Sequence, residues 1–355
     1  MTDPTKDPTK ASGTHSRSAP SLAAVLIGRN EGARLVLCLN SIRAASTGSA
    51  VDTETAVTET ILTGTPVTGT PVAGTAATGT VGMAPPLTPT ITRIVYVDSG
   101  STDGSVAAAT AAGAEVVVLD KTLPFTAARA RNAGLAALRA SGDLPDYIQF
   151  VDGDCEVQPA WIVTALAFLA ANPKAAVACG RRRERFPQAS VYNRLCDAEW
   201  DTPVGEATAC GGDALMLRQA LDEVGGYNPT LIAGEEPEMC VRLRAKGWQI
   251  WRLDAEMALH DANMTRFAQW WKRTRRGGHA AAEGMALHGA GPDRLGVAMT
   301  RRALIWGVAL PVVTLTLVAL YGPLALSLLL IYPPRPSASP AVTAARARPG
   351  SGPFS

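Results

Sequence analysis

The sequence predicts an α/β protein with a doubly wound, mostly parallel sheet. Four short apolar runs have the length of buried strands, at residues 22–27, 93–97, 115–119 and 147–151. Helical patterns separate them, the clearest at 31–42 and 125–139. Strands that alternate with helices form parallel sheets with helices on both faces. We assign the globular domain to residues 21–290.

Two segments within and before this domain have a different composition. Residues 45–92 consist mainly of Thr, Gly, Pro, Ala and Val, and they lack the large side chains that a core needs. We interpret 45–92 as a low-complexity, disordered insertion and 1–20 as a disordered N-terminus without a secretory signal. Because closing a long flexible loop costs little more free energy than closing a short one, residues 49–89 should be dispensable.

Charge and cysteine content exclude several classes of protein. The chain of 355 residues has a net charge of +2, which argues against nucleic-acid binding. Its six cysteines are widely spaced without a C-x-x-C pair, so neither a zinc site nor a disulfide framework is indicated. The length suits one large domain with an appendage, or two small domains.

A membrane segment is predicted near the C-terminus. Residues 303–332 carry no charge, and they exceed the roughly 20 residues that span a bilayer. Pro311 and Gly322-Pro323 interrupt the run, so it reads as one kinked span, a span with a re-entrant piece, or a buried hairpin. We favour membrane insertion, with the catalytic domain on the cytoplasmic side of the inner membrane because an arginine pair precedes the run. Residues 333–355 read as a disordered tail.

Acidic residues follow the predicted strands at the ends where open α/β sheets bind ligands. Asp152-Gly153-Asp154 follows the run 147–151, and Asp98 follows 93–97. Such oxygen ligands suit Mg²⁺ or Mn²⁺ bridging a diphosphate, although Asp-Gly is also a common turn dipeptide. Neither the dinucleotide G-x-G-x-x-G pattern nor the P-loop pattern is present.

Several short blocks, in order, resemble the motifs of family 2 glycosyltransferases, which have the GT-A fold. They are IGRNE (27–31), VDSGSTDGS (97–105), ARNAG (130–134), DGD (152–154), GGY (225–227) and GEEPE (234–238). The resemblance covers about residues 21–278. It implies an enzyme that moves a sugar from a nucleotide-diphospho-sugar donor, of UDP or GDP type, to a lipid-linked or saccharide acceptor.

The resemblance also implies roles for individual residues. Asp98 would contact the nucleotide base, Asp152 the ribose or a metal, and Asp154 the Mn²⁺ or Mg²⁺ on the diphosphate. His260 is the candidate that would complete the metal shell, although a lone histidine is more often structural. The remaining expected donor-binding residues are Asn30, Glu31, Arg129 and Arg131.

The catalytic base is expected within the GEEPE block. Glu236 stands where the family usually carries Asp, so the resemblance leaves open whether Glu235 or Glu236 faces the acceptor. Pro237 reads as the first residue of a helix, and a helix N-terminus stabilises the ionised carboxylate that a general base requires. The neighbouring glutamates oppose this by raising the pKa. The alternative interpretation is an ordinary acidic helix start.

The resulting hypothesis is a metal-dependent, inverting and membrane-associated glycosyltransferase of polysaccharide or glycolipid biosynthesis. The absence of Q-x-x-R-W indicates single transfers rather than processive polymerisation. The basic, aromatic stretch 270–276 suits a lipid headgroup interface or a solvated helix packed by its tryptophans. Two rival functions are a sugar nucleotidyltransferase, for which residues 28–31 are too short and acidic, and a non-catalytic nucleotide-sugar-binding protein.

Overall fold

The structure is a computed structural model that describes residues 20–47, 90–142 and 144–332. Most of the segments expected to be disordered, at 1–20, 45–92 and 333–355, lie outside the described residues. The described elements reach slightly into the expected insertion, since helix α1 continues to Thr47 and strand β2 begins at Ile91.

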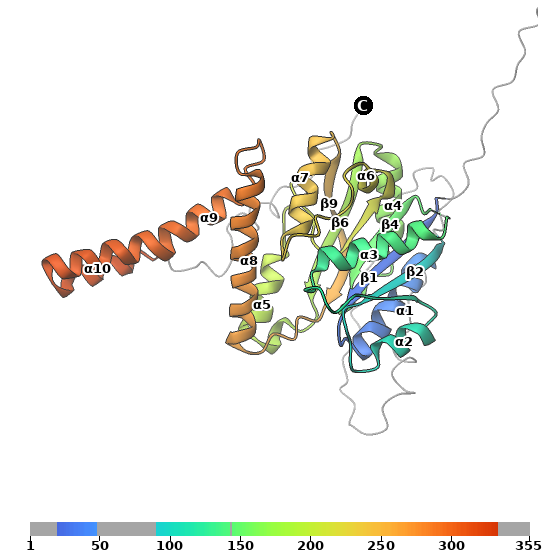
Figure 1. Cartoon of the computed structure of the whole chain (residues 1–355), viewed down its shortest axis with the longest axis horizontal. Helices are drawn as coiled ribbons and strands as arrows, with labels where there is room; N and C mark the ends of the chain where they lie inside the picture. Colours follow the sequence, from blue (N-terminus) through green and yellow to red (C-terminus); the bar gives the residue numbers. More distant parts are fainter. Residues whose placement is uncertain (1–19, 48–89, 143, 333–355) are drawn as a thin grey trace, which may run out of the picture.

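A single mixed sheet forms the centre of the domain (Figure 1). Its strand order is β3-β2-β1-β4-β8-β6-β9-β5, and β7 pairs with β9. The strands β3, β2, β1 and β4 are mutually parallel, whereas β8 runs antiparallel to both β4 and β6. The bounds are β1 Leu22–Gly28, β2 Ile91–Asp98, β3 Glu115–Val118, β4 Tyr147–Asp152, β5 Cys155–Val157, β6 Ala175–Glu184, β7 Gly205–Ala207, β8 Ala214–Leu217 and β9 Gln249–His260.

Helices cover both faces of the sheet, as right-handed crossovers require. The chain moves toward one sheet edge through α1 and α2 and returns through α3, which lies across the front of the sheet in Figure 1. The bounds are α1 Ala33–Thr47, α2 Ser105–Ala111, α3 Ala127–Ala140, α4 Trp161–Ala171, α5 Val191–Glu199, α6 Arg218–Glu223, α7 Glu235–Ala245, α8 Phe267–His288, α9 Val297–Leu304 and α10 Leu310–Tyr321. Short helical turns are η1 Pro187–Ala189, the π-helical η2 Ile305–Ala309 and the 3-10 segment η3 Pro323–Ile331.

One helix begins earlier than the sequence predicts. Helix α7 begins at Glu235 rather than at Pro237, because Gly234 adopts φ 83° and forms the N-cap. Pro237 is tolerated in the first turn, where backbone N–H groups have no intrahelical acceptor. Helix α8 begins at Phe267, and the Gln269 side chain accepts the backbone N–H of Arg266 at its start.

Strand β9 is long, because it pairs along its length with β6 and β7 and at its end with β5. Charged residues interrupt its apolar pattern, and Asp254 is exposed. Its length matters for function, since it carries the chain to His260 beside β5.

The core requires a close approach between α3 and β1. A Cβ atom added at Gly134 in α3 would lie 2.3 Å from Cγ1 of Val25, a side chain that is 1% exposed. By contrast, a Cβ atom at Gly277 in α8 would have no heavy atom within 4 Å. Gly134, the glycine of the ARNAG block, therefore has a packing role.

We predict that Gly134→Ala lowers the free energy of unfolding by about 1–3 kcal/mol, the usual range for overpacking a core. The matched substitution Gly277→Ala should be neutral or stabilising by up to about 1 kcal/mol, since alanine favours helix at an uncrowded position. Urea unfolding of both variants measures the difference. Equal stability of the two variants would contradict this account of Gly134.

Candidate functional site

The carboxyl ends of β1, β2 and β4 meet at one edge of the sheet, as expected. Asp98 ends β2 and is 1% exposed. Its carboxylate accepts the backbone N–H groups of Gly100 at 2.8 Å and Ser101 at 2.9 Å, and the Tyr96 hydroxyl at 3.2 Å. Although burial opposes ionisation, these donors hold the pKa of Asp98 below its usual value. Asp98 therefore shapes the loop after β2.

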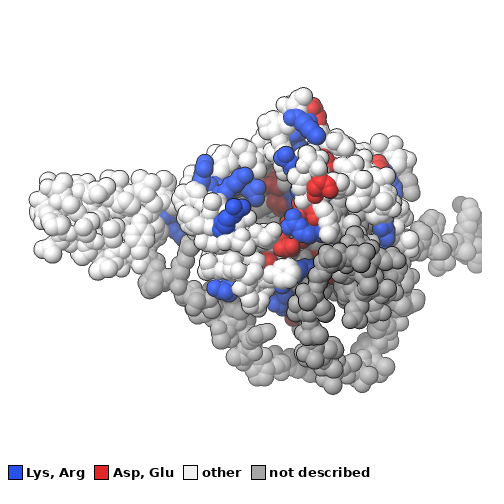
Figure 2. Space-filling view, turned by 90° about the horizontal axis from the view of Figure 1, so that it is seen from below, with Lys and Arg blue, Asp and Glu red and all other residues white. Residues whose placement is uncertain are grey.

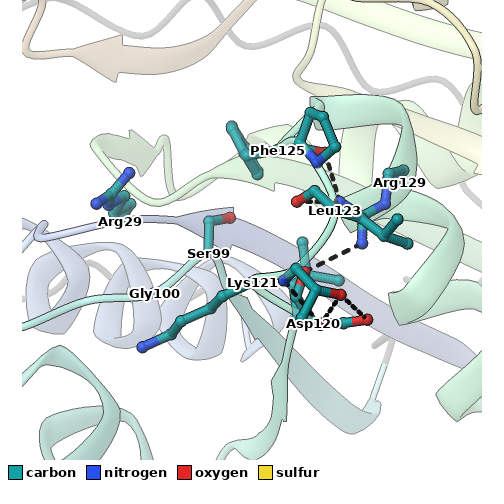
Figure 3. A pocket seen from close by; sticks show the side chains of 11 residues that line it. Arg29, Ser99, Gly100, Asp120, Lys121, Leu123, Phe125 and Arg129 are labelled. Carbon is teal, nitrogen blue, oxygen red and sulfur yellow. Dashed lines mark hydrogen bonds between the residues drawn. The ribbon is translucent and has the colours of Figure 1, made fainter.

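A pocket of about 340 Å³ opens beside this loop (Figure 3). Arg29, Ser99 and Gly100 line one part, and the loop 119–125 lines another. Arg129 lies at its wall, where its guanidinium donates to the carbonyl oxygens of Leu123, Pro124 and Asp120. The expected donor-binding Arg129 thus borders the pocket and also holds the loop that forms it.

Asn30 and Glu31, the two expected donor-binding residues that follow β1, contact residues of the adjacent loop and helix. The side chain of Asn30, which has φ 58°, accepts the backbone N–H of Thr102 at 2.7 Å. Glu31 pairs with Arg34 at 2.6 Å, and burial raises the pKa of its carboxyl.

Asp152, the first aspartate of the DGD block, lies between two arginines. Its carboxylate contacts Arg131 at 3.0 Å and Arg182 at 3.3 Å, and its backbone N–H donates to Asp213 at 2.9 Å. Burial raises its pKa, but the two guanidinium groups outweigh burial and hold the pKa below the usual value. Asp152 is therefore a fixed anion that organises the centre of the site.

Asp154, the second aspartate of the DGD block, faces the end of β9. Its Oδ2 lies 3.3 Å from Nε2 of His260. Burial, together with the charge of Asp152, raises the pKa of Asp154 to about 7. Burial also holds the pKa of His260 well below its usual value, so its imidazole is neutral. The neighbouring ring nitrogen, Nδ1, lies 3.6 Å from Glu184 and makes no hydrogen bond.

A metal ion would fit between Asp154 and His260. Ligand atoms of Asp154, Cys155 and His260 lie within 4.8 Å of one another, and a carboxylate with a neutral imidazole is a donor set that Mn²⁺ accepts. A second group comprises Asp152, Cys155 and Asp213, but arginines already pair with both of its carboxylates. The Cys155 thiol is buried and donates to Asp213, which leaves it poorly suited as a ligand.

The charge balance also favours a cation here. Around the DGD block, five carboxyl groups share two guanidinium groups, namely Asp152, Asp154, Asp213, Glu235 and Glu236 with Arg131 and Arg182. Because two positive charges cannot balance five ionised carboxylates, the raised pKa values of Asp154, Asp213 and Glu236 have repulsion between carboxylates as a common cause besides burial.

Both glutamates of the GEEPE block reach the same arginine. Glu235 and Glu236 each place a carboxylate oxygen 2.8 Å from Nη1 of Arg131. Side-chain exposure differs, at 7% for Glu235 and 14% for Glu236. Burial raises the pKa of Glu236 to about 7, even though Arg131 opposes this shift. Arg131, expected to contact the donor, thus joins the DGD block to the start of α7 from a buried position.

Sequence analysis missed three residues that complete the site. Arg182 bridges Asp152 and Asp213, and its guanidinium lies 4.8 Å from the centre of the Trp200 ring. Glu184 faces His260 from the end of β6. The sequence did contain a signal for Asp213. A strand that runs antiparallel to its neighbours begins at the edge where those neighbours end, so a residue just before it can join the site. Asp213 directly precedes β8 in this way.

The shifted pKa of Asp154 predicts a pH-dependent stability difference. The folded-state pKa of about 7 exceeds the ordinary 3.8, so the folded protein retains a proton that the unfolded chain loses as pH rises from about 4 to 7. This destabilises the metal-free fold above pH 7 and has no effect below pH 4. We expect Asp154→Asn to remove the penalty and raise stability at pH 8 by about 1–4 kcal/mol, with a smaller gain at pH 5.

Thermal unfolding in a chelator at both pH values measures this gain. The control is Asp254→Asn, which replaces an exposed carboxylate of β9 and should leave stability nearly unchanged. A destabilised Asp154→Asn variant at pH 8 would show that the carboxylate supports the fold.

Comparison with known proteins gives a family match and a curated relative for part of the chain. Residues 86–225 match the family described as Glycosyl transferase family 2. The succinoglycan biosynthesis protein ExoA of Rhizobium meliloti (strain 1021) is 29% identical over 181 residues, which cover 48% of this chain and 54% of that protein. The chain thus spans about half the length of the curated relative it matches.

One solved structure shares this fold, and a second superposes with a lower score. The mannosyltransferase PcManGT of Pyrobaculum calidifontis, in complex with GDP-Man and Mn²⁺, superposes with a TM-score of 0.54 at 17% identity, over 93% of this chain and 81% of that one. Glucosyl-3-phosphoglycerate synthase of Mycobacterium tuberculosis gives a TM-score of 0.45 at 15% identity, over 74% of this chain and 79% of that one.

The matched motifs and the fold define the class of this protein. The domain has the GT-A fold, and the resemblance to family 2 glycosyltransferases that the motifs predict is confirmed. Residues 86–225 match family 2 glycosyltransferases, and the domain shares the fold of a glycosyltransferase of known structure.

Proposed function

We propose that the protein transfers a sugar from a nucleotide-diphospho-sugar to a hydroxyl group of a lipid-linked or saccharide acceptor, with inversion at the anomeric carbon. The observation that carries this proposal is the arrangement around Arg131, which holds Asp152 of the DGD block and Glu236 of α7 in one buried cluster. The aspartates of the DGD block, expected to bind the donor, and the separate carboxylate of Glu236 would therefore face the same site.

The nucleotide would lie at the pocket beside β2. Arg29 and Lys121 line this pocket and give it positive charge near the expected diphosphate. Arg129 and Asp98 would act by holding the two pocket loops, at 119–125 and 99–104, in a fixed shape. UDP and GDP are the expected nucleotides, and the complex of the mannosyltransferase with GDP-Man supports including GDP in the test.

Asp154 and His260 would hold Mn²⁺ or Mg²⁺, with Glu184 as acceptor for the second ring nitrogen of His260. When bound, the ion would supply Lewis-acid stabilisation of the departing diphosphate. Metal binding would also relieve the excess negative charge that, after burial, raises the pKa of Asp154.

Glu236 would accept the proton of the acceptor hydroxyl as that oxygen attacks the anomeric carbon. The two electrons of the sugar–phosphate bond would leave with the nucleoside diphosphate. A pKa of about 7 suits a general base, because the group is ionised in part near neutral pH and still accepts a proton well. Glu235, which is more buried, would hold Arg131 in place.

We also propose that the chain acts at the cytoplasmic face of the inner membrane, in polysaccharide or glycolipid synthesis. The similarity to a succinoglycan biosynthesis protein supports the pathway class, and the apolar helix Val297–Tyr321 supports membrane association.

Thermal shift of the full-length protein in detergent, with a panel of nucleotide sugars and with or without Mn²⁺, would test the proposal. We expect stabilisation by one UDP- or GDP-sugar in the presence of metal, and slow release of free sugar and nucleoside diphosphate without acceptor. Binding without any sugar release or transfer would favour a non-catalytic nucleotide-sugar-binding protein. Pyrophosphate formation from a nucleoside triphosphate and a sugar phosphate would favour a nucleotidyltransferase.

A further inference from the structure

The apolar C-terminal segment folds back on itself. Helices α9, η2 and α10 form one continuous helix, Val297–Tyr321, and the 3-10 segment η3 then returns along α10. At the end of η3 the ring of Tyr332 lies 5.7 Å from the ring of Trp306, near the start of the apolar run. The Tyr332 hydroxyl also donates to the carbonyl oxygen of Trp306. The two ends of the uncharged run therefore lie side by side.

The sequence itself encodes the reversal. Gly322, between α10 and η3, has φ 85° and ψ −178°, a backbone region that is essentially restricted to glycine. Pro323 follows and cannot donate a backbone hydrogen bond to continue α10. A side chain at position 322 would disfavour this conformation, so the Gly-Pro pair is the feature that separates a hairpin from a straight helix.

Between the paired rings of Trp306 and Tyr332 the two arms are similar in length and shorter than the hydrocarbon layer, whereas the whole helix Val297–Tyr321 is long enough to span it. From Trp306 to Tyr321 an α-helix rises about 22 Å, and the nine residues of η3 return about 18 Å. The hydrocarbon layer of a membrane is about 30 Å thick. A straight helix over residues 303–331 would instead extend about 44 Å, well beyond that thickness.

The surface of this hairpin is apolar around its tip. Side chains there are largely exposed, with Leu320 at 68%, Tyr321 at 77% and Leu324 at 87%. Only 6% of the apolar window in Val297–Tyr321 is buried. Figure 1 shows the hairpin projecting away from α8, and Figure 2 shows that its visible surface carries no charge beyond the junction with the domain. Arg301 and Arg302, both exposed, lie on α9 near this junction.

We propose that residues 303–332 form a re-entrant hairpin that enters one leaflet of a lipid bilayer and leaves on the side it entered. This deepens the proposed membrane association and rests on it. The tip 320–324 would lie in hydrocarbon, while Trp306 and Tyr332 would lie together at the interface that aromatic side chains prefer. Arg301 and Arg302 would meet the phosphate groups of the same leaflet. The chain beyond Tyr332 would then emerge on the side of the catalytic domain.

Cysteine labelling in sealed membrane vesicles tests this topology. The six native cysteines are buried, so a membrane-impermeant maleimide should report mainly on an introduced site. Lys272→Cys, on the exposed face of α8, reports the side of the catalytic domain, and Ser337→Cys reports the chain beyond Tyr332. We expect both sites to be labelled in inside-out vesicles and protected in right-side-out vesicles.

Labelling of Ser337→Cys and Lys272→Cys from opposite sides would overturn the hairpin in favour of a single span. Full-length protein that stays in the supernatant after ultracentrifugation without detergent would overturn membrane insertion altogether. Neither readout depends on sugar transfer, so each can fail while the proposed enzymatic function holds, or hold while that function fails.

A second pair of variants tests the turn. In the Ser337→Cys background, replacing Gly322 and Pro323 together by leucine should let α10 continue and move Ser337 to the opposite side of the membrane. The control Gly307→Leu changes a glycine of the same segment whose Cβ position is open, and it should leave the labelling side unchanged. Unchanged labelling in the double variant would show that Gly322-Pro323 does not set the topology.

Discussion

Replacing Asp154 by Asn should abolish the Mn²⁺-dependent part of UDP or GDP binding while the fold is retained. Asp154 lies at the end of the DGD block with one carboxylate oxygen 3.3 Å from Nε2 of His260. An amide keeps the shape but loses the negative charge that a hard cation requires. Titration calorimetry with each nucleotide, in Mn²⁺ and in chelator, should show a metal-dependent gain in affinity for the parent protein and none for the variant.

The control for this experiment is Asp254→Asn. Asp254 is exposed and lies on β9, the strand that also carries His260, and its variant should retain the metal-dependent gain in affinity. His260→Ala should weaken metal-dependent binding as well, because it removes the other side chain that faces Asp154. Unchanged metal dependence in Asp154→Asn would remove Asp154 from the metal site, whatever the result with His260.

The sequence predicted correctly that the acidic strand ends meet at one edge of the sheet, because strand ends are easy to recognise. Asp98 and the DGD block each follow a short apolar run, and parallel strands bring such ends to one edge. The local roles of Asn30 and Arg129 were harder to predict, since their side chains bind loops whose shape depends on the whole edge.

The contacts of Arg131 could not be predicted from sequence. Its partner Glu235 lies 104 positions away, and their contact depends on how α3 and α7 meet across the sheet. The same holds for Arg182, which β6 brings to Asp152 and Asp213. A resemblance to motifs assigns residues to a site, but packing decides which of them touch each other and which face the substrate.

The membrane segment illustrates a different limit. Absence of charge over residues 303–332 predicted insertion, and three topologies remained open. Hydropathy gives the length of an apolar run but not its path, because leucine suits a span and a hairpin equally. The direction of the chain after α10 depends on the backbone conformation of Gly322. Its φ of 85° is seen only in the folded structure.

Replacing Glu236 by Gln should lower turnover by about 10²-fold or more, the scale of a lost general base, while donor affinity stays near that of the parent protein. The carboxylate is 14% exposed and its pKa is near 7, whereas Glu235 is 7% exposed and lies deeper beside Arg131. Glutamine can still accept a hydrogen bond from Arg131, so the cluster keeps its geometry. It cannot take up the acceptor proton.

The pH dependence separates a base from a structural partner of Arg131. With saturating donor and metal, the activity of the parent protein should rise through about pH 7 as Glu236 ionises, and the residual activity of Glu236→Gln should lack that rise. Glu235→Gln is the matched control, because it removes charge from the same arginine without removing the proposed base. It should keep the pH-dependent rise, even if stability falls. An inactive Glu235→Gln beside a nearly unaffected Glu236→Gln would reverse the assignment within this pair.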